Sequence, residues 1–176
     1  MSKVIVYIAT SLDGYVAGEN DDLSWIEVYN TAGEDHGYAQ FIKNIGTAIM
    51  GARTYDQSLK HPERMMYGRK NYILSDTPML VPSGVDAEFY RGNLATLVEK
   101  IKKESDKDIF VVGGGQVVSS FLNAGLVDEL LHFVAPVLIK KGIPLYSTLD
   151  NKINLRLTEA VPYKTGIVKL HYIPKK

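Results

Sequence analysis

Three consecutive glycines, Gly113 to Gly115, stand between two segments of different periodicity. The preceding run, Asp108 to Val112, is typical of a buried strand, and the following one, Gln116 to Asn123, of a helix that ends at Gly125. Glycines at the end of a strand let a ligand or another backbone approach closely. The free N–H groups and the dipole of the next helix favour an anion there. The run therefore predicts a pyrophosphate site, unless the glycines serve only a tight turn and its packing.

A second transition from strand to helix lies earlier, where Gly51 follows the apolar run Thr47 to Met50. Arg53 and Thr54 come next, and a guanidinium, a hydroxyl and free backbone N–H groups can hold a phosphate together. Arg53 could equally lie on a solvated helix face. Ser75 ends the next apolar run and could supply one more donor, because ligands collect at the carboxyl ends of strands in α/β sheets.

Composition excludes several other chemistries. The sequence has no cysteine, which excludes disulfides, thiolate nucleophiles and zinc–thiolate sites. Its four histidines are scattered without metal-ligand spacing, so we expect no metal. Twenty basic residues balance twenty acidic ones, which predicts neither a nucleic-acid nor a membrane partner. The N-terminal apolar run alternates like a strand and does not resemble a signal peptide, so we expect a cytoplasmic protein.

These features need a scaffold in which strands and helices alternate. Helical spacing predicts helices at Gly33 to Ile45 and after Asn93, which caps the second one. Strands are predicted at Lys3–Thr10, Thr47–Met50, Lys70–Leu74, Val85–Tyr90, Asp108–Val112, Glu129–Pro136, Asn154–Val161 and Ile167–Ile173. This order predicts an α/β fold in which helices flank both faces of a mixed sheet that ends in an antiparallel hairpin. We expect a single domain over residues 1–176.

Five segments in register resemble the dihydrofolate reductase superfamily. They are Tyr7–Gly18 (YIATSLDGYVAG), Ile49–Asp56 (IMGARTYD), Ile73–Pro78 (ILSDTP), Val111–Leu122 (VVGGGQVVSSFL) and Leu126–Tyr146 (LVDELLHFVAPVLIKKGIPLY). They keep the family's order and spacing over nearly the whole chain. The branch that they resemble most comprises stand-alone bacterial relatives of the riboflavin-biosynthesis reductase domain, the RibD C-terminal domain. The resemblance implies a dihydrofolate reductase-like sheet and a site for NADPH.

The resemblance also implies which residues bind NADPH. The family's phosphate-binding positions correspond to Gly51, Arg53, Thr54 and Ser75 for the adenosine part and to Gly114, Gly115, Gln116 and Val117 for the pyrophosphate, while Ile8 and Ala9 correspond to the nicotinamide contacts. A loop from Gly14 to Asn20 would close over the nicotinamide and exclude water.

The chain departs from the family's pattern at several positions. Ala52 stands where dihydrofolate reductases often have arginine. Asp76 replaces a common phosphate-binding serine or threonine, and a carboxylate is unfavourable near a 2′-phosphate. Gly113 replaces the glutamate that riboflavin-pathway reductases place before their paired glycines. Lys140 and Lys141 replace a turn that contains glycine.

Asp35 is the candidate for binding the substrate and for catalysis. It lies sixteen residues before Gly51, which is the family's offset for the carboxylate that binds the pterin. In a closed apolar pocket its pKa would be raised, and it could hold or relay the proton that reduction requires. Asp35 also precedes a predicted helix, where an aspartate commonly caps the N-terminus; both interpretations stay open. Trp25 could stack on a planar heterocycle, or belong to the core or its rim.

The leading prediction is a reductase that uses NADPH to reduce a pyrimidine- or pteridine-like substrate. The resemblance implies 5-amino-6-(5-phosphoribosylamino)uracil reductase of riboflavin biosynthesis, or dihydrofolate reductase, as the two named activities. The alternatives are an NADP(H)-binding regulatory protein without turnover and a purely structural oligomerisation module. The apolar run Leu130 to Val134, together with the family's habits, predicts a homodimer through the C-terminal strands.

Overall fold

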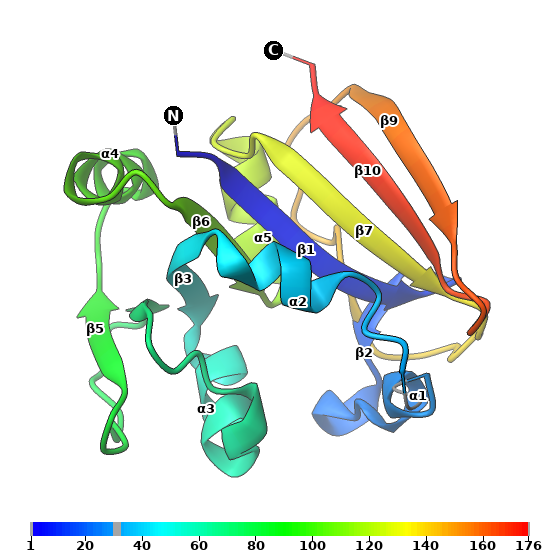
Figure 1. Cartoon of the computed structure of the whole chain (residues 1–176), viewed down its shortest axis with the longest axis horizontal. Coiled ribbons are helices and arrows are strands. Elements are labelled where there is room, and N and C mark those ends of the chain that lie inside the picture. Colours follow the sequence, from blue (N-terminus) through cyan, green and yellow to red (C-terminus); the bar gives the residue numbers. More distant parts are fainter. Residues whose placement is uncertain (1, 30–32, 176) are drawn as a thin grey trace.

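The protein, described by a computed structural model over residues 2–29 and 33–175, is built on one eight-stranded sheet (Figure 1). In sheet order the strands are β5 (Asp86–Tyr90), β4 (Lys70–Leu74), β3 (Ile45–Gly51), β6 (Asp108–Gly113), β1 (Val4–Ser11), β7 (Glu129–Ala135), β10 (Val168–Pro174) and β9 (Leu155–Pro162). Two short strands, β2 (Tyr15–Ala17) and β8 (Ile143–Pro144), form a separate antiparallel pair.

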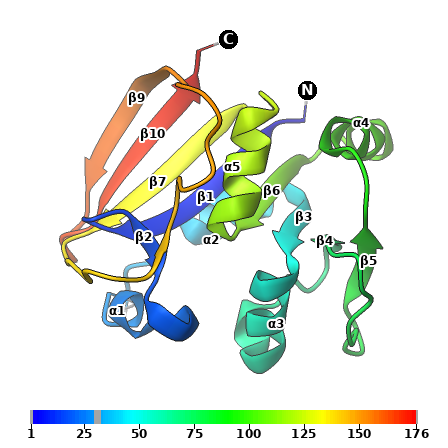
Figure 2. The same cartoon turned by 180° about the vertical axis from the view of Figure 1, so that it is seen from behind.

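The helices cover both faces of this sheet. They are α1 (Ser24–Glu27), α2 (Tyr38–Lys43), α3 (Ala52–Lys60), α4 (Leu94–Glu104) and α5 (Gly115–Asn123), with 3-10 turns η1 (Glu19–Asp21) and η2 (Pro62–Arg64). Helix α2 lies in front of the sheet in Figure 1, whereas α5 crosses the opposite face in Figure 2. No helix in the described part of the chain is long and apolar enough to cross a membrane.

The pairing confirms the predicted mixed sheet with its terminal hairpin. Six adjacent strands are parallel to one another: β5, β4, β3, β6, β1 and β7. Strand β10 pairs antiparallel with both β7 and β9. The carboxyl ends of β3, β4, β5 and β6 therefore meet at one edge of the sheet. That edge carries every phosphate-binding residue that the sequence predicts.

Alternation along β1 divides the core between the two faces. Val6 and Ile8 pack in one cluster with residues of α4 and α5, whereas Tyr7 and Ala9 face the opposite side of the sheet. The apolar run Leu130 to Val134 forms most of β7, which lies inside the sheet between β1 and β10. Leu130 and Phe133 are buried within the chain. Core packing thus accounts for much of this run, and the homodimer remains a prediction.

Of two local predictions, one needs correction and the other is confirmed. The helix predicted from Gly33 to Ile45 is wrong at both ends, because it extends only from Tyr38 to Lys43. His36 and Gly37 have φ values of 53° and 83°, in the left-handed region, where a right-handed helix cannot continue. The capping prediction is confirmed, since the Asn93 side chain accepts a hydrogen bond from the Thr96 N–H at 3.1 Å.

Candidate active site

Two corners where a strand turns into a helix lie side by side at the carboxyl edge of the sheet. We call them the glycine corners: one at Gly51, between β3 and α3, and one at Gly113 to Gly115, between β6 and α5. Met50 faces Gly113 across the paired strands. A Cβ atom added to Gly51 would lie only 3.1 Å from Cγ2 of Val117 in α5. The absence of a side chain at Gly51 therefore lets the two corners pack together.

The glycines of the second corner differ in what requires them. Gly113 has a φ of 125°, which favours glycine, and its peptide bond to Gly114 is cis. A Cβ atom on Gly115 would lie 2.7 Å from the carbonyl oxygen of Pro144, so close packing excludes any side chain there. Gly114 has an ordinary φ of −73°. A Cβ atom there would meet nothing closer than Oγ1 of Thr54 at 3.6 Å.

Gly114 is thus the glycine that packing does not explain. It is the N-terminal cap of α5, a nine-residue helix whose first N–H groups have no partner within the helix. An anion that approached these groups would need the backbone at Gly114 to be uncovered. The corner therefore fits a phosphate of a dinucleotide, with Thr54 from the other corner beside it.

The side chain of Arg53 extends from α3 to η1, in the segment that follows β2. Its Nη2 atom lies 2.6 Å from Oδ1 of Asp21 in η1, although its side chain is largely exposed. An exposed ion pair of this kind contributes at most about 1 kcal/mol to stability. The guanidinium is therefore held near the corners but is available for exchange onto a stronger anion. Gln116 is exposed at the start of α5.

The predicted 2′-phosphate position contains a cation that the sequence analysis missed. Ser75 is engaged locally, since its Oγ donates to the Thr77 carbonyl at 2.7 Å and accepts from the Thr77 N–H at 3.1 Å. Asp76 pairs with Arg91 at 3.0 Å. Arg91 directly follows β5, and the Ser75 N–H donates to the Tyr90 carbonyl at 3.3 Å. The unfavourable carboxylate at Asp76 is therefore offset by a neighbouring guanidinium.

Ile8 and Ala9 cannot both present side chains to one ligand. They are consecutive residues of β1 and point to opposite faces of the sheet. Ile8 reaches the second glycine corner, since its Cδ1 lies 3.5 Å from where a Cβ atom of Gly113 would be. Ala9 packs with the cluster around Trp25 and Phe133. The structure therefore places only the side chain of Ile8 against the corner, and that of Ala9 on the opposite face, in the cluster around Trp25.

Asp35 caps helix α2. Its carboxylate accepts hydrogen bonds from the N–H groups of Gly37 and Ala39, each at 2.9 Å. These bonds, that from Ala39 first, lower the pKa of Asp35, and the side chain is exposed. The expectation of a raised pKa in a closed apolar pocket is wrong for this structure. Asp35 is ionised at neutral pH, so it is a hydrogen-bond acceptor and not a proton donor.

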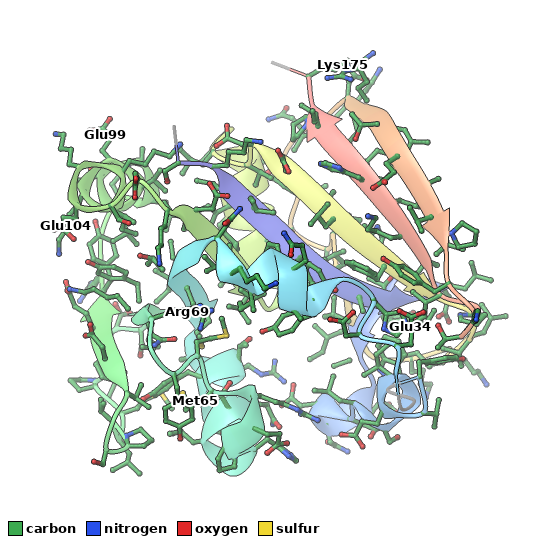
Figure 3. The ribbon with its side chains drawn as sticks, in the orientation of Figure 1. Glu34, Met65, Arg69, Glu99, Glu104 and Lys175 are labelled. Atoms are coloured by element: carbon green, nitrogen blue, oxygen red, sulfur yellow. The ribbon has the colours of Figure 1, made fainter. Side chains whose placement is uncertain are left out.

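Residues far away in the sequence hold the Asp35 segment, Glu34 to Gly37, in place. The hydroxyls of Tyr7 and Tyr163 both donate to the His36 carbonyl, at 3.2 and 2.9 Å. Thr165 Oγ1 lies 2.9 Å from Nε2 of the buried His36 ring. Figure 3 shows Glu34 where this segment approaches the turn between β9 and β10. Nothing in the sequence pattern links residues 163 and 165 to residue 36, so these contacts were not predicted.

An aromatic cluster borders the Asp35 segment. Trp25 is 9% exposed and packs with Phe133, and both Tyr7 and Tyr163 contact this cluster. Trp25 is thus a core residue, the second of its two interpretations. Its indole Nε1 is nevertheless buried without a hydrogen-bond partner in the described part of the chain. A buried N–H donor normally has a partner, so this atom is an exception among the described residues.

The described residues contain no cluster of three or more histidine, aspartate or glutamate side chains able to hold a metal ion. His132 is engaged elsewhere, on the face of the sheet that α5 covers. Its Nε2 lies 2.8 Å from Oγ1 of Thr10, and burial lowers its pKa to about 4.

Comparison with known proteins agrees with this geometry. The RibD C-terminal domain family matches residues 87–169. The uncharacterized protein YwjB of Bacillus subtilis (strain 168) is 30% identical over 172 residues, which cover 97% of each chain. The chain also superposes on a Shewanella sp. PV-4 protein provisionally assigned to riboflavin biosynthesis, with a TM-score of 0.87, 26% identity and 99% of both chains covered.

A more distant structure shares the fold alone. It is a pyrimidine reductase-like protein from Corynebacterium diphtheriae, with a TM-score of 0.75 and 15% identity over 99% of this chain and 92% of that one. Full-length similarity to YwjB, the RibD match and the adjoining glycine corners lead to one assignment. The chain belongs to the dihydrofolate reductase superfamily, among the stand-alone proteins that resemble the RibD C-terminal domain.

Proposed function

We propose that this protein is a reductase that uses NADPH to reduce a pyrimidine- or pteridine-like substrate. The family and its fold neighbours include reductases, and the RibD match points to the aminouracil chemistry of riboflavin biosynthesis. One observation carries the proposal: the two glycine corners adjoin, and Gly114 leaves the start of α5 uncovered. Such a pair of corners is suited to one dinucleotide that bridges them.

Different residues would bind different parts of NADPH. The N–H groups at the start of α5 would hold the pyrophosphate, and Thr54 would donate to it from the first corner. Arg91, beside Ser75, would favour a ligand that carries a 2′-phosphate. NADPH, when bound, would supply a hydride. The side chain of Ile8 would cover the site next to Gly113 and exclude water there.

Asp35 and Trp25 provide complementary groups for a planar heterocycle. The ionised carboxylate of Asp35 can accept hydrogen bonds from ring or amino N–H groups. The indole N–H of Trp25, which has no partner among the described residues, would donate to a ring carbonyl that reached it. Pyrimidines and pteridines that carry both amino and carbonyl groups offer this pattern. The role of Asp35 is then to bind and orient the substrate.

A second candidate is a regulatory protein that binds NADP(H) without turnover. The lowered pKa of Asp35 favours it, because an ionised carboxylate cannot give a proton to the substrate at neutral pH. Both candidates share the cofactor site. They differ in whether bound NADPH is consumed.

The decisive experiment compares the wild type with Asp35→Asn. Asparagine also caps helices well, so the variant should fold. NADPH oxidation would be followed with dihydrofolate and with the riboflavin-pathway aminouracil. We expect turnover with one of them, at least a hundredfold loss in Asp35→Asn, and NADPH affinity within about twofold of the wild type.

The other outcomes are also informative. NADPH binding without oxidation of either substrate would favour the regulatory protein. Saturation with NADPH at 100 times its Kd should stabilise the fold by about 2.7 kcal/mol. A melting temperature that does not respond to NADPH would contradict both candidates.

A further inference from the structure

A hollow of about 640 Å³ lies between the first loop, the start of α3 and the turn that follows β7. Its lining carries three cations, Arg53, Lys140 and Lys141, against one carboxylate, Glu19. The cations come from segments nearly ninety residues apart in a protein without net charge. Figure 2 shows how the segment after β7 passes beside β2, so that the turn faces the loop.

The turn that carries Lys140 and Lys141, which we call the lysine turn, is held against the loop that follows β1. The carboxylate of Asp13 accepts the N–H groups of Ile139 and Lys140, at 3.2 and 2.8 Å. The Tyr15 hydroxyl donates to the Lys140 carbonyl at 3.3 Å. Asp13 therefore joins the loop after β1 to the turn after β7 through backbone N–H groups. These contacts hold both lysines at the rim of the hollow before any ligand arrives.

Lys140 keeps its side chain where the backbone favours glycine. Its φ is 69°, in the left-handed region that disfavours residues with a Cβ atom. At this turn the sequence departs from a pattern in which glycine is usual. A lysine in a conformation better suited to glycine is a candidate for a functional role.

The two lysines also lack partners. Within the described residues, neither ammonium group lies within 4.0 Å of a carboxylate, whereas Arg53 pairs with Asp21. The hollow therefore holds two unpaired cations and one that is weakly engaged. This arrangement matches a compact dianion, which accepts several charged hydrogen bonds at once.

We infer that the hollow binds the phosphate group of a phosphorylated small molecule. Lys140 and Lys141 bind the phosphate from the lysine turn. Arg53, in α3, leaves its ion pair with Asp21 and binds the phosphate instead. The inference extends the proposed function. It rests on that function only in assuming that Arg53 lies beside a bound nucleotide. The phosphate belongs either to the dinucleotide or to a phosphorylated substrate.

The test removes the two lysine charges and measures binding by calorimetry. The double variant Lys140→Gln/Lys141→Gln is compared with Lys103→Gln/Lys107→Gln, which removes two exposed lysines at the other end of β6. The ligands are NADPH, NADH, ribose 5-phosphate and, as the uncharged match, ribose. We expect at least tenfold weaker binding of one phosphorylated ligand in the first variant, and no change in the control.

A third variant separates binding from folding. Lys140→Gly should raise the melting temperature, because it relieves the left-handed backbone, and should still weaken the same ligand. A turn with only a structural role would not show both effects.

The affected ligand identifies the source of the phosphate. Loss with NADPH alone indicates the 2′-phosphate, loss with both nucleotides the pyrophosphate, and loss with ribose 5-phosphate a substrate. The inference is overturned if no phosphorylated ligand binds the wild type, or if all bind both double variants equally. Lysine-dependent binding of ribose 5-phosphate without nucleotide binding would support the inference and contradict the proposed function. NADPH turnover that is unchanged in the lysine double variant would support the proposed function and contradict the inference.

Discussion

The glycine corners and the Asp35 segment are built in different ways. The corners arise where two neighbouring parallel strands both end in glycine, so the pairing brings two sequence motifs to one place. The Asp35 segment has little regular structure, and the hydroxyls of Tyr7 and Tyr163 hold it from opposite ends of the chain. Local motifs therefore determine the proposed cofactor site. Long-range contacts determine the proposed substrate site.

This difference predicts that the two sites respond differently to substitution. A strand-to-helix corner depends on backbone conformation and on a few glycines. A segment held by side-chain hydroxyls depends on single hydrogen bonds, each worth about 1 kcal/mol. Substitutions should therefore affect cofactor binding strongly at the corners and substrate binding gradually around Asp35.

The largest effect is expected at Gly114. Gly114→Ala should weaken NADPH about a hundredfold, because the methyl group would block charged hydrogen bonds worth roughly 3 kcal/mol. The free energy of unfolding should hardly change, since the nearest atom is 3.6 Å away. The matched variant Gly115→Ala should instead lose about 1–3 kcal/mol of stability through overpacking. Calorimetry and urea unfolding would measure both, and wild-type NADPH affinity in Gly114→Ala would contradict our account of this corner.

A smaller effect is expected at the edge of the cofactor site. Arg91→Gln should weaken NADPH about tenfold and leave NADH unchanged, because one charged hydrogen bond contributes about 1.5 kcal/mol or more. Fluorescence titration with both nucleotides would measure the ratio. Arg156→Gln, on the exposed strand β9, serves as the control. Equal weakening of both nucleotides would place Arg91 away from the 2′-phosphate.

Around Asp35 the expected effect is smaller again. Tyr163→Phe removes one of the two hydroxyl donors to His36, so the substrate KM should rise a few-fold while NADPH affinity stays constant. The free energy of unfolding should fall by about 1 kcal/mol. Tyr67→Phe, at a partly exposed ring, is the matched control. A change in NADPH affinity instead would mean that the two regions are coupled.

His132 should affect neither region at neutral pH. Its folded-state pKa of about 4 lies below its ordinary value of 6.5, so the unfolded chain binds more protons between these pH values. The free energy of unfolding should therefore fall as the pH drops from 6.5 to 4, by at most roughly 1.4 kcal/mol per pH unit. His132→Gln should flatten this dependence in urea titrations, whereas His61→Gln should not. An unchanged slope would show that His132 is not the group responsible.

Sequence patterns alone predicted the eight strands of the mixed sheet and the two glycine corners, but not the short elements α1, β2 and β8. These follow from periodicity and glycine placement, which act over a few residues. The failures have a common cause. The helix before β3 is shorter than its apolar spacing predicts because His36 and Gly37 adopt left-handed conformations. Arg91 was missed because only strand register brings it beside Ser75 and Asp76.

Only the tertiary structure decided the positions of Asp35, of Trp25 and of the turn that carries Lys140 and Lys141. The placement of each depends on partners more than a hundred residues away, such as Tyr163 for the Asp35 segment, Phe133 for Trp25 and Asp13 for Lys140. A pKa depends on how exposed a group is and on which N–H groups reach it, and neither is encoded in local spacing. The sequence therefore predicted the two corners proposed to hold the phosphates of a dinucleotide, and the fold determined which charged side chains lie around them.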